Sequence, residues 1–155
     1  MRDLDRLDRR LLDLLQNDGR LAITELAQRV GLSATACTER VRRLERDGVI
    51  SGYYARVNPR ALGKGLLVFV DLKLAAKSAA AFDRVRDQLA VMPEVMECHL
   101  ISGEFDYLIK ARIAEMTDYR RFLGTILDKL PGAVESRSYV VMEEVKESLY
   151  LSPFN

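Results

Sequence analysis

The chain has 155 residues, 48% of them apolar, and a formal net charge of only +1. This length and apolar content are sufficient for two small domains with buried cores, and no apolar run approaches the roughly 20 residues that span a bilayer. The opening residues, MRDLD, lack the apolar core of a signal peptide. We therefore expect a cytoplasmic protein without a membrane partner.

Apolar residues recur at helical spacing twice before residue 31: Leu4, Leu7, Leu11 and Leu14, then Ile23, Leu26, Ala27 and Val30. The first helix should end near residues 17–19. Gly31 follows the second stripe, where a left-handed residue typically ends a helix, and Ser33 is a good N-cap for a third helix.

The third helix, which should end at Asp47-Gly48, has a core face and a polar face. At 100° per residue, Ala34, Val41 and Leu44 fall within about 60° of Cys37. The opposite and flanking positions carry residue types that contact phosphates and base edges: Thr35, Thr38, Glu39, Arg42, Arg43 and Arg46. With Ser33, these are the candidate DNA contacts of a helix-turn-helix. The alternative is an ordinary three-helix bundle whose arginines only form a solvated face.

Residues 49–57, which include Tyr53 and Tyr54, should be extended and form a short wing, so that residues 1–57 make a winged helix-turn-helix domain. This segment holds 11 Arg and 9 Asp or Glu, a balance of only +2. Non-specific DNA affinity grows with the number of phosphates neutralised. A single copy should therefore bind DNA weakly, and several linked copies should act on one site.

A hinge-like stretch at residues 58–65 precedes a different pattern at residues 66–155. Strands are expected at 66–74, 95–101, 105–112 and 134–145, and helices that end at Pro93 and Pro131 separate them. Ser102-Gly103-Glu104 is the expected hairpin turn. The order βαββαβ is that of a ferredoxin-like αβ-sandwich, so the whole chain is assigned to the α+β class.

The first of these strands has apolar residues on both faces. Val68 and Val70 share one face, and Leu67 and Phe69 occupy the other. A sheet face that carries apolar residues is normally covered, which predicts that a second copy of the chain packs there.

The sequence offers little for catalysis. Its only histidine, His99, lies in an expected strand, and Cys37 and Cys98 fall in different domains at positions expected to be buried. No Cys/His pair has metal-ligand spacing, and neither a glycine-rich phosphate loop nor a nucleophile–base pair is evident. We therefore expect neither an enzyme, nor a metal site, nor a cofactor.

Five blocks resemble, in order, the Lrp/AsnC family of bacterial and archaeal transcription regulators: LDRLDRRLLDLLQNDGR, ITELAQRVGLS, CTERVRRLERDGVISGY, ECHLISGEFDYLIKARI and LPGAVESRSYVVMEEVKES. The resemblance implies a winged helix-turn-helix, a hinge, and a C-terminal domain that dimerises and binds a small effector, usually an amino acid. It also implies that dimers assemble into octamers around which DNA wraps, and a role as activator or repressor on the nucleoid.

In this family the effector lies between dimers, at the turn that here begins at Ser102. Backbone N–H groups near Gly103 are accessible to a carboxylate because glycine has no side chain, and Asp106 is the candidate acceptor for the ammonium. The expected effector-binding residues are Ser102, Gly103, Glu104, Asp106, Tyr107, Ser136, Ser138 and Val140. The alternative is a plain β-hairpin with a solvated aspartate.

We therefore expect a transcription regulator that binds double-stranded DNA as a homo-oligomer, a dimer or more readily an octamer, and responds to a leucine-like amino acid. One alternative is an effector-independent protein that organises the chromosome. Another is a ligand-binding or interaction module that no longer reads DNA, against which Thr35, Thr38 and the arginine-rich face argue.

Overall fold

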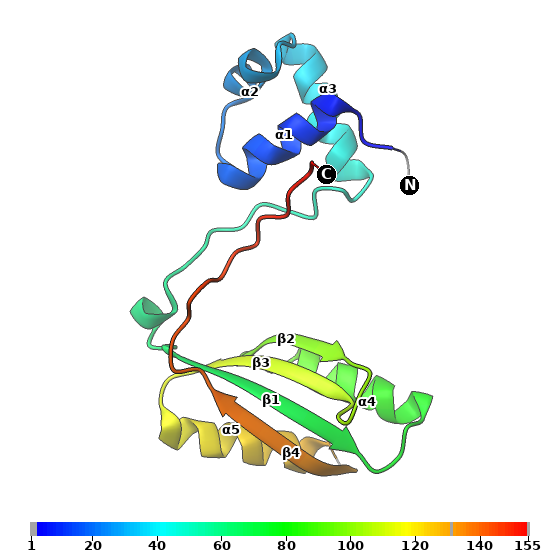
Figure 1. Cartoon of the computed structure of the whole chain (residues 1–155), viewed down its shortest axis with the longest axis vertical. Coiled ribbons are helices and arrows are strands. Elements are labelled where there is room, and N and C mark those ends of the chain that lie inside the picture. Colours follow the sequence, from blue (N-terminus) through cyan, green and yellow to red (C-terminus); the bar gives the residue numbers. More distant parts are fainter. Residues whose placement is uncertain (1–2, 131, 155) are drawn as a thin grey trace. The chain divides into compact units, whose positions relative to one another are not determined.

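The structure is a computed structural model that describes residues 3–130 and 132–154. By its internal contacts the chain divides into two compact units: residues 1–56 with 146–155, and residues 57–145 (Figure 1). We call them the N-terminal unit and the sheet unit. Both ends of the sequence therefore belong to the same unit, whereas the sequence predicted that residues 146–155 would belong to the C-terminal domain.

The N-terminal unit contains three helices: α1 (Arg6–Asn17), α2 (Ile23–Val30) and α3 (Ala34–Arg46). Their apolar stripes meet in one core of buried residues: Leu11, Leu14, Leu26, Ala27, Cys37 and Val41. Gly31 ends α2 in the left-handed conformation (φ 72°), and the Ser33 hydroxyl accepts a 3.2 Å hydrogen bond from the Ala36 N–H at the start of α3. The predicted helices and caps are thus confirmed.

The segment expected to form the wing is not a β-strand in the single chain. Residues 49–57 contain no β-strand, although all of them are described. A strand needs a hydrogen-bonded neighbour, and no strand of the described residues pairs with this segment. Its Tyr53 instead turns back to α3, where its hydroxyl donates to Glu45 Oε1 at 3.0 Å. Two effects raise the pKa of Tyr53 to about 12: the larger is desolvation by burial, and the smaller is the hydrogen bond to Glu45.

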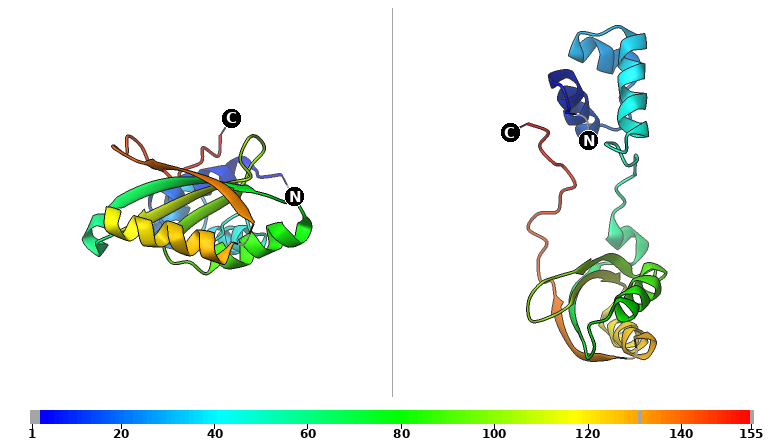
Figure 2. Two further views of the ribbon diagram at one scale, coloured as in Figure 1. Left: turned by 90° about the horizontal axis from the view of Figure 1, so that it is seen from below. Right: turned by 90° about the vertical axis from the view of Figure 1, so that its right-hand side faces the viewer.

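The sheet unit begins with a short 3₁₀ turn, Pro59–Leu62, and continues as β1 (Leu66–Leu74), α4 (Ala79–Ala90), β2 (Val95–Leu100), β3 (Tyr107–Ile113), α5 (Met116–Lys129) and β4 (Ala133–Val140). The strands form an antiparallel sheet in the order β2-β3-β1-β4. Figure 2 shows that α4 and α5 cover the same face. The expected ferredoxin-like order is confirmed. β4 ends five residues before the predicted Val145, and Pro131 lies outside the described residues.

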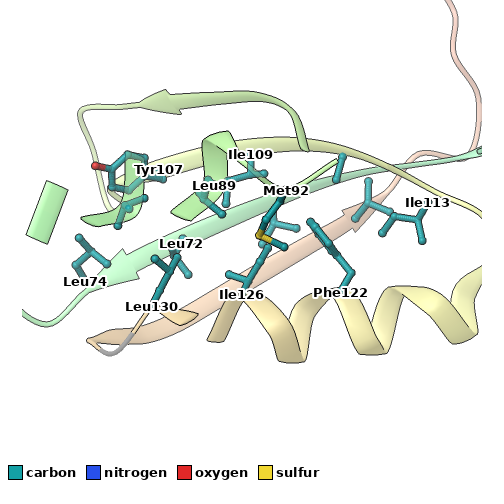
Figure 3. Packing of buried hydrophobic residues seen from close by; sticks show 14 residues of the cluster. Leu72, Leu74, Leu89, Met92, Tyr107, Ile109, Ile113, Phe122, Ile126 and Leu130 are labelled. Atoms are coloured by element: carbon teal, nitrogen blue, oxygen red, sulfur yellow. The ribbon is translucent and has the colours of Figure 1, made fainter. Parts of the chain in front are cut away.

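The core of the sheet unit lies between the sheet and these two helices (Figure 3). Alternate residues of β1 and β3 point into it: Val68, Val70, Leu72, Tyr107, Ile109, Ala111 and Ile113. Helix residues such as Leu89, Phe122 and Ile126 fill the space opposite them. Within residues 3–130 and 132–154, no helix combines the length and apolar character that a bilayer crossing requires.

The opposite sheet face, which we call the open face, is partly covered by the chain itself. Leu67 is only 7% exposed. The adjacent Arg112 is also buried and pairs with Glu144 through contacts of 3.1 and 2.5 Å. Part of the cover that the sequence assigned to a second copy is therefore provided within the chain. Cys98, expected to be buried, is exposed on the edge strand β2, whereas Cys37 is buried as expected.

Candidate DNA interface and ligand site

α3 has the two faces that its sequence predicts. Cys37, Val41 and Leu44 are buried, whereas Arg42 and Arg46 leave 70% and 73% of their side chains exposed. Their partners, Glu39 and Asp47, lie 3.7 Å away at exposed positions. Such exposed pairs stabilise a fold little. Both guanidinium groups are therefore available to a phosphate or a base.

The N-terminal end of α3 presents small polar groups. Ser33 and Thr35 are exposed, and the Thr38 hydroxyl donates to the Ala34 carbonyl at 2.8 Å. The Ser33 oxygen accepts from the Ala36 N–H, so its own proton remains available to an outside acceptor. This end of the helix, with its unpaired N–H groups, also favours a phosphate.

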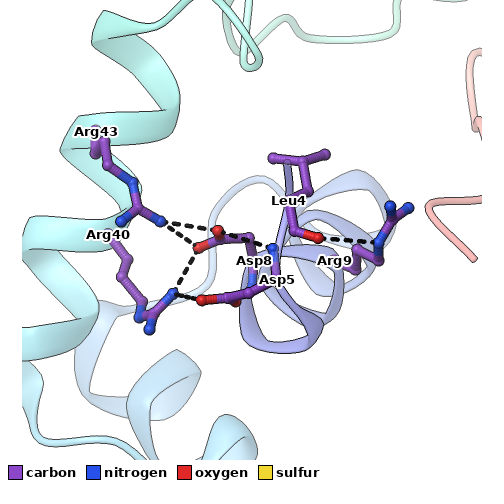
Figure 4. Close-up of polar contacts among 6 residues, drawn as sticks. All are labelled: Leu4, Asp5, Asp8, Arg9, Arg40 and Arg43. Atoms are coloured by element: carbon purple, nitrogen blue, oxygen red, sulfur yellow. Dashed lines mark hydrogen bonds and ion pairs between the residues drawn. The ribbon is translucent and has the colours of Figure 1, made fainter. Parts of the chain in front are cut away.

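Arg43, by contrast, is engaged inside the fold. Its Nη2 lies 2.7 and 2.8 Å from the two carboxylate oxygens of Asp8, which is 3% exposed (Figure 4). Arg40 Nη1 joins the same cluster at 2.8 Å from Asp8 and 2.6 Å from Asp5. A charge-assisted pair with a buried carboxylate fixes side-chain geometry. Arg43 thus orients α3 on α1, which differs from its expected role as a DNA contact.

Asp8 can serve both arginines because it also belongs to the start of α1. The Asp5 side chain accepts the Asp8 N–H at 2.8 Å and Asp8 accepts the Asp5 N–H at 3.3 Å, a capping box built from two aspartates. The Asp8 N–H bond, together with Arg40, lowers the pKa of Asp5 despite some desolvation. Helical spacing places Asp8 about 60° from Leu11, on the core side of α1, but it does not identify Arg40 and Arg43 as the partners of this carboxylate.

The predicted effector turn lies between β2 and β3. Ser102, Gly103 and Glu104 are exposed, and Gly103 adopts φ 143° with open space around the position of a Cβ atom. That conformation is strained for any residue with a side chain. An accessible backbone therefore exists at this turn, as the sequence predicts.

Asp106 is not an open acceptor. It is 4% exposed, its Oδ2 accepts the Leu74 N–H at 2.8 Å, and its Oδ1 pairs with Lys77 Nζ at 2.8 Å. Burial alone would raise its pKa, but the Leu74 bond and the Lys77 charge outweigh burial and lower it. These contacts differ from the expected role, since one oxygen already holds the end of β1 and the other is paired with Lys77. Glu104, with 62% of its side chain exposed and only a 3.6 Å ion pair with the exposed Arg137, is the accessible carboxylate of this turn.

Ser136, Ser138 and Val140 do not converge on the turn within one chain. They pair with Leu72, Val70 and Val68 and therefore share the helix-facing side of the sheet. The Ser138 hydroxyl there receives a hydrogen bond from Tyr119 of α5. Tyr107 also faces this side, where its ring meets Phe82 edge-on at 6.2 Å.

Arg137, which sequence reasoning missed, is the β4 residue that reaches the turn. Its guanidinium lies 4.8 Å from the centre of the Phe105 ring and 3.6 Å from Glu104. It pairs in register with Asp71 on the open face. The alternation that placed Ser136 and Ser138 on one side leaves Arg137 on the other, and that is the signal that would have found it.

The sequence matches the family described as winged helix-turn-helix DNA-binding over residues 4–51, and the family described as Lrp/AsnC ligand binding domain over residues 67–151. Such a pair of domains defines the class: a ligand-responsive, DNA-binding transcription regulator. The chain is 52% identical, over 95% of its length and 90% of theirs, to the leucine-responsive regulatory proteins of Escherichia coli (strain K12) and Klebsiella pneumoniae.

Solved structures of similar fold support the same family assignment. An AsnC family transcriptional regulator from Agrobacterium tumefaciens superposes with a TM-score of 0.91 at 34% identity, and a Neisseria meningitidis regulator in complex with L-methionine with 0.89 at 32%. Each comparison covers 96% of both chains. The chain therefore belongs to the Lrp/AsnC family.

Proposed function

We propose that this regulator reads DNA with the outward face of α3. The contact set is Ser33, Thr35, Thr38, Glu39, Arg42 and Arg46. The exposure of Arg42 and Arg46, beside the engaged Arg43, carries this assignment. Arginines on the outward face of a recognition helix pair with guanine edges or phosphates, and Arg43 acts indirectly by holding that helix.

We further propose that its effector is an amino acid with an aliphatic or thioether side chain. The relatives named leucine-responsive and the solved complex with L-methionine support this class. The exposed backbone at Gly103 suits the carboxylate, and Glu104 is the open acceptor for the ammonium. Asp106 positions this turn by holding it to the end of β1.

The effector site is proposed to form between copies of the chain. In one chain the turn and the Ser136–Ser138–Val140 face lie on different sides of the sheet. A second copy that offers its β4 to the turn would bring the two sets together. This arrangement accounts for candidate residues that do not meet within a single chain.

Exposed apolar side chains support association into dimers and, from those, octamers. Met142 is 99% and Val145 87% exposed just after β4. The edge strands add Met96 and Leu100 on β2 and Tyr139 and Val140 on β4. Apolar residues beside open strand edges are typical of surfaces that pair with another chain. We place the assembled protein in the cytoplasm, on the nucleoid.

A ligand panel tests the effector. Thermal melting with each of the twenty amino acids should show stabilisation by leucine or methionine, about 2.7 kcal/mol at 100 times the Kd. Glu104→Gln should abolish that shift, and Glu143→Gln, an exposed carboxylate away from the turn, should keep it. A shift that survives in Glu104→Gln would remove this turn from the site, and no shift with any amino acid would favour an effector-independent regulator.

A further inference from the structure

Residues 146–155 return to the N-terminal unit although the strand before them belongs to the sheet unit. The ligand-binding family extends to residue 151, so sequence similarity assigns most of this segment to the other domain. The chain consequently passes between its two units twice, once after Arg56 and once before Lys146. We call residues 150–153 the tail.

α1 binds the tail with side chains from one face. Arg9, Asp13 and Gln16 are spaced by four and three residues, and at 100° per residue they lie about 140–200° from Leu11, which points into the core. α1 is therefore amphipathic, and its polar face has a specific partner. One face packs in the core, and the polar groups of the opposite face contact the tail.

Most of the hydrogen bonds between α1 and the tail involve backbone groups of the tail. Gln16 makes a reciprocal pair with Leu151, in which its Nε2 donates to the carbonyl at 2.8 Å and its Oε1 accepts the N–H at 2.8 Å. Arg9 Nη1 donates to the Pro153 carbonyl at 2.7 Å, and the Tyr150 hydroxyl donates to Asp13 Oδ1 at 2.9 Å. The carboxamide of glutamine matches both hydrogen-bonding groups of one residue, a pattern that selects an extended peptide.

We infer that the outer face of α1 is a docking site for residues 150–153 of the same chain, and that it fastens the DNA-binding unit to the ligand-binding unit at a second point. A unit attached at one point turns about its linker, whereas a unit attached at two points loses much of that freedom. The second attachment follows β4 along the chain, because residues 141–149 join the end of β4 to the tail. This inference does not depend on the identity of the effector.

Hydrogen exchange of the full chain tests the docking. The Leu151 amide, held by Gln16, should exchange at least tenfold faster in Gln16→Ala, because the closed contact is what protects it. Gln28→Ala, at an exposed position on α2, is the matched control and should leave the Leu151 rate unchanged. Tyr150→Phe, which loses only the Asp13 bond, should give a smaller increase.

A second measurement follows motion of the units. Backbone ¹⁵N relaxation should show shorter effective correlation times for α1, α2 and α3 in Gln16→Ala than in the unaltered chain, with the sheet unit unchanged. Equal Leu151 exchange in Gln16→Ala and the unaltered chain would overturn the docking. Protection that disappears on dilution would assign the tail to a second copy, which would also overturn the inference. A tail released without any change in relaxation would overturn the second attachment.

Discussion

The two functional surfaces of this regulator are built on opposite plans. The proposed DNA-reading surface is one face of α3, lies within residues 33–46 and is held on α1 through Asp8. The proposed ligand surface is divided between a turn and the helix-facing side of β4, which one chain does not bring together. A site carried by a single helix exists in each copy, whereas a site divided in this way depends on assembly.

The largest effect is expected for a substitution that removes a proposed DNA contact of α3 without disturbing the fold. Arg42→Ala should lower operator affinity by about 5- to 150-fold per engaged protomer, since a base-reading arginine contributes about 1–3 kcal/mol, without changing the melting temperature. Arg43→Ala is the informative contrast, because it should lower the melting temperature through loss of the Asp8 pair. Fluorescence anisotropy on operator DNA and calorimetric melting give the two readouts. Equal DNA affinity of Arg42→Ala and the unaltered protein would remove Arg42 from the interface.

The next effect tests the support behind that surface. Asp8→Ala removes the acceptor shared by Arg40 and Arg43 and should cost about 1.5–3 kcal/mol of unfolding free energy, the usual value of hydrogen bonds to charged groups. Urea titration measures it. Asp13→Ala, on the outer face of the same helix, should cost less than half as much. A loss in Asp8→Ala no greater than in Asp13→Ala would mean that the cluster does not hold α3 on α1.

A third prediction moves to the ligand surface and concerns Asp106. Asp106→Ala leaves the Leu74 N–H without its acceptor and should destabilise the sheet unit by about 1–3 kcal/mol, whereas Asp106→Asn keeps an acceptor and should lose less. Because the folded pKa of Asp106 is lowered, its charge contributes stability above the ordinary aspartate value of about 4. That contribution is lost as pH falls through the lowered pKa.

Comparing Asp106→Asn with the unaltered chain across a range of pH measures this contribution. Melting temperatures recorded between pH 7 and pH 2 should fall less steeply at the acid end for Asp106→Asn than for the unaltered chain. Asp5, whose pKa is also lowered, contributes in the same direction and remains present in both proteins. Identical pH profiles would show that the Asp106 charge does not stabilise the fold.

The smallest change in stability is expected for Ser138→Ala, which tests whether two copies share the effector site. Ser138→Ala loses one exposed hydrogen bond with Tyr119 and should change stability by about 1 kcal/mol or less. If β4 of one copy completes the turn of another, the variant should nonetheless weaken amino-acid binding measured by calorimetry. Ser51→Ala, in the segment after α3, is the control. Unchanged effector affinity in Ser138→Ala would exclude this hydroxyl from the site.

Much of this could be predicted from sequence where the information is local. The helices, the Ser33 cap and the core face of α3 depend on residues within a few positions of each other, and apolar spacing reveals them. The roles of Arg43 and Asp106 could not be predicted, because each depends on partners more than 25 residues away. Arg43 pairs with Asp8 at the start of α1, and Asp106 contacts Leu74 at the end of β1 and Lys77 just beyond it. Periodicity indicates which face of a helix or strand a residue occupies, but it does not identify the oppositely charged residue that contacts it in the folded chain.

The wing segment and the tail share one difficulty, because the structure of each depends on a partner segment that local sequence does not reveal. The composition of residues 49–57 favours a strand, but a strand requires a hydrogen-bonded neighbour, and no described strand pairs with this segment. The tail carries no sequence signal for its docking, because α1 contacts mainly its backbone.

The docking of residues 150–153 on α1 has a consequence for how the protein is made. Residues 1–56 leave the ribosome first, but the outer face of α1 stays unoccupied until the whole sheet unit, residues 57–145, has been translated. At about 5–20 residues per second this interval lasts roughly 4 to 18 s. The helix-turn-helix is thus synthesised early and fastened late, and only a chain translated past its own ligand-binding unit has its DNA-binding unit held at both points.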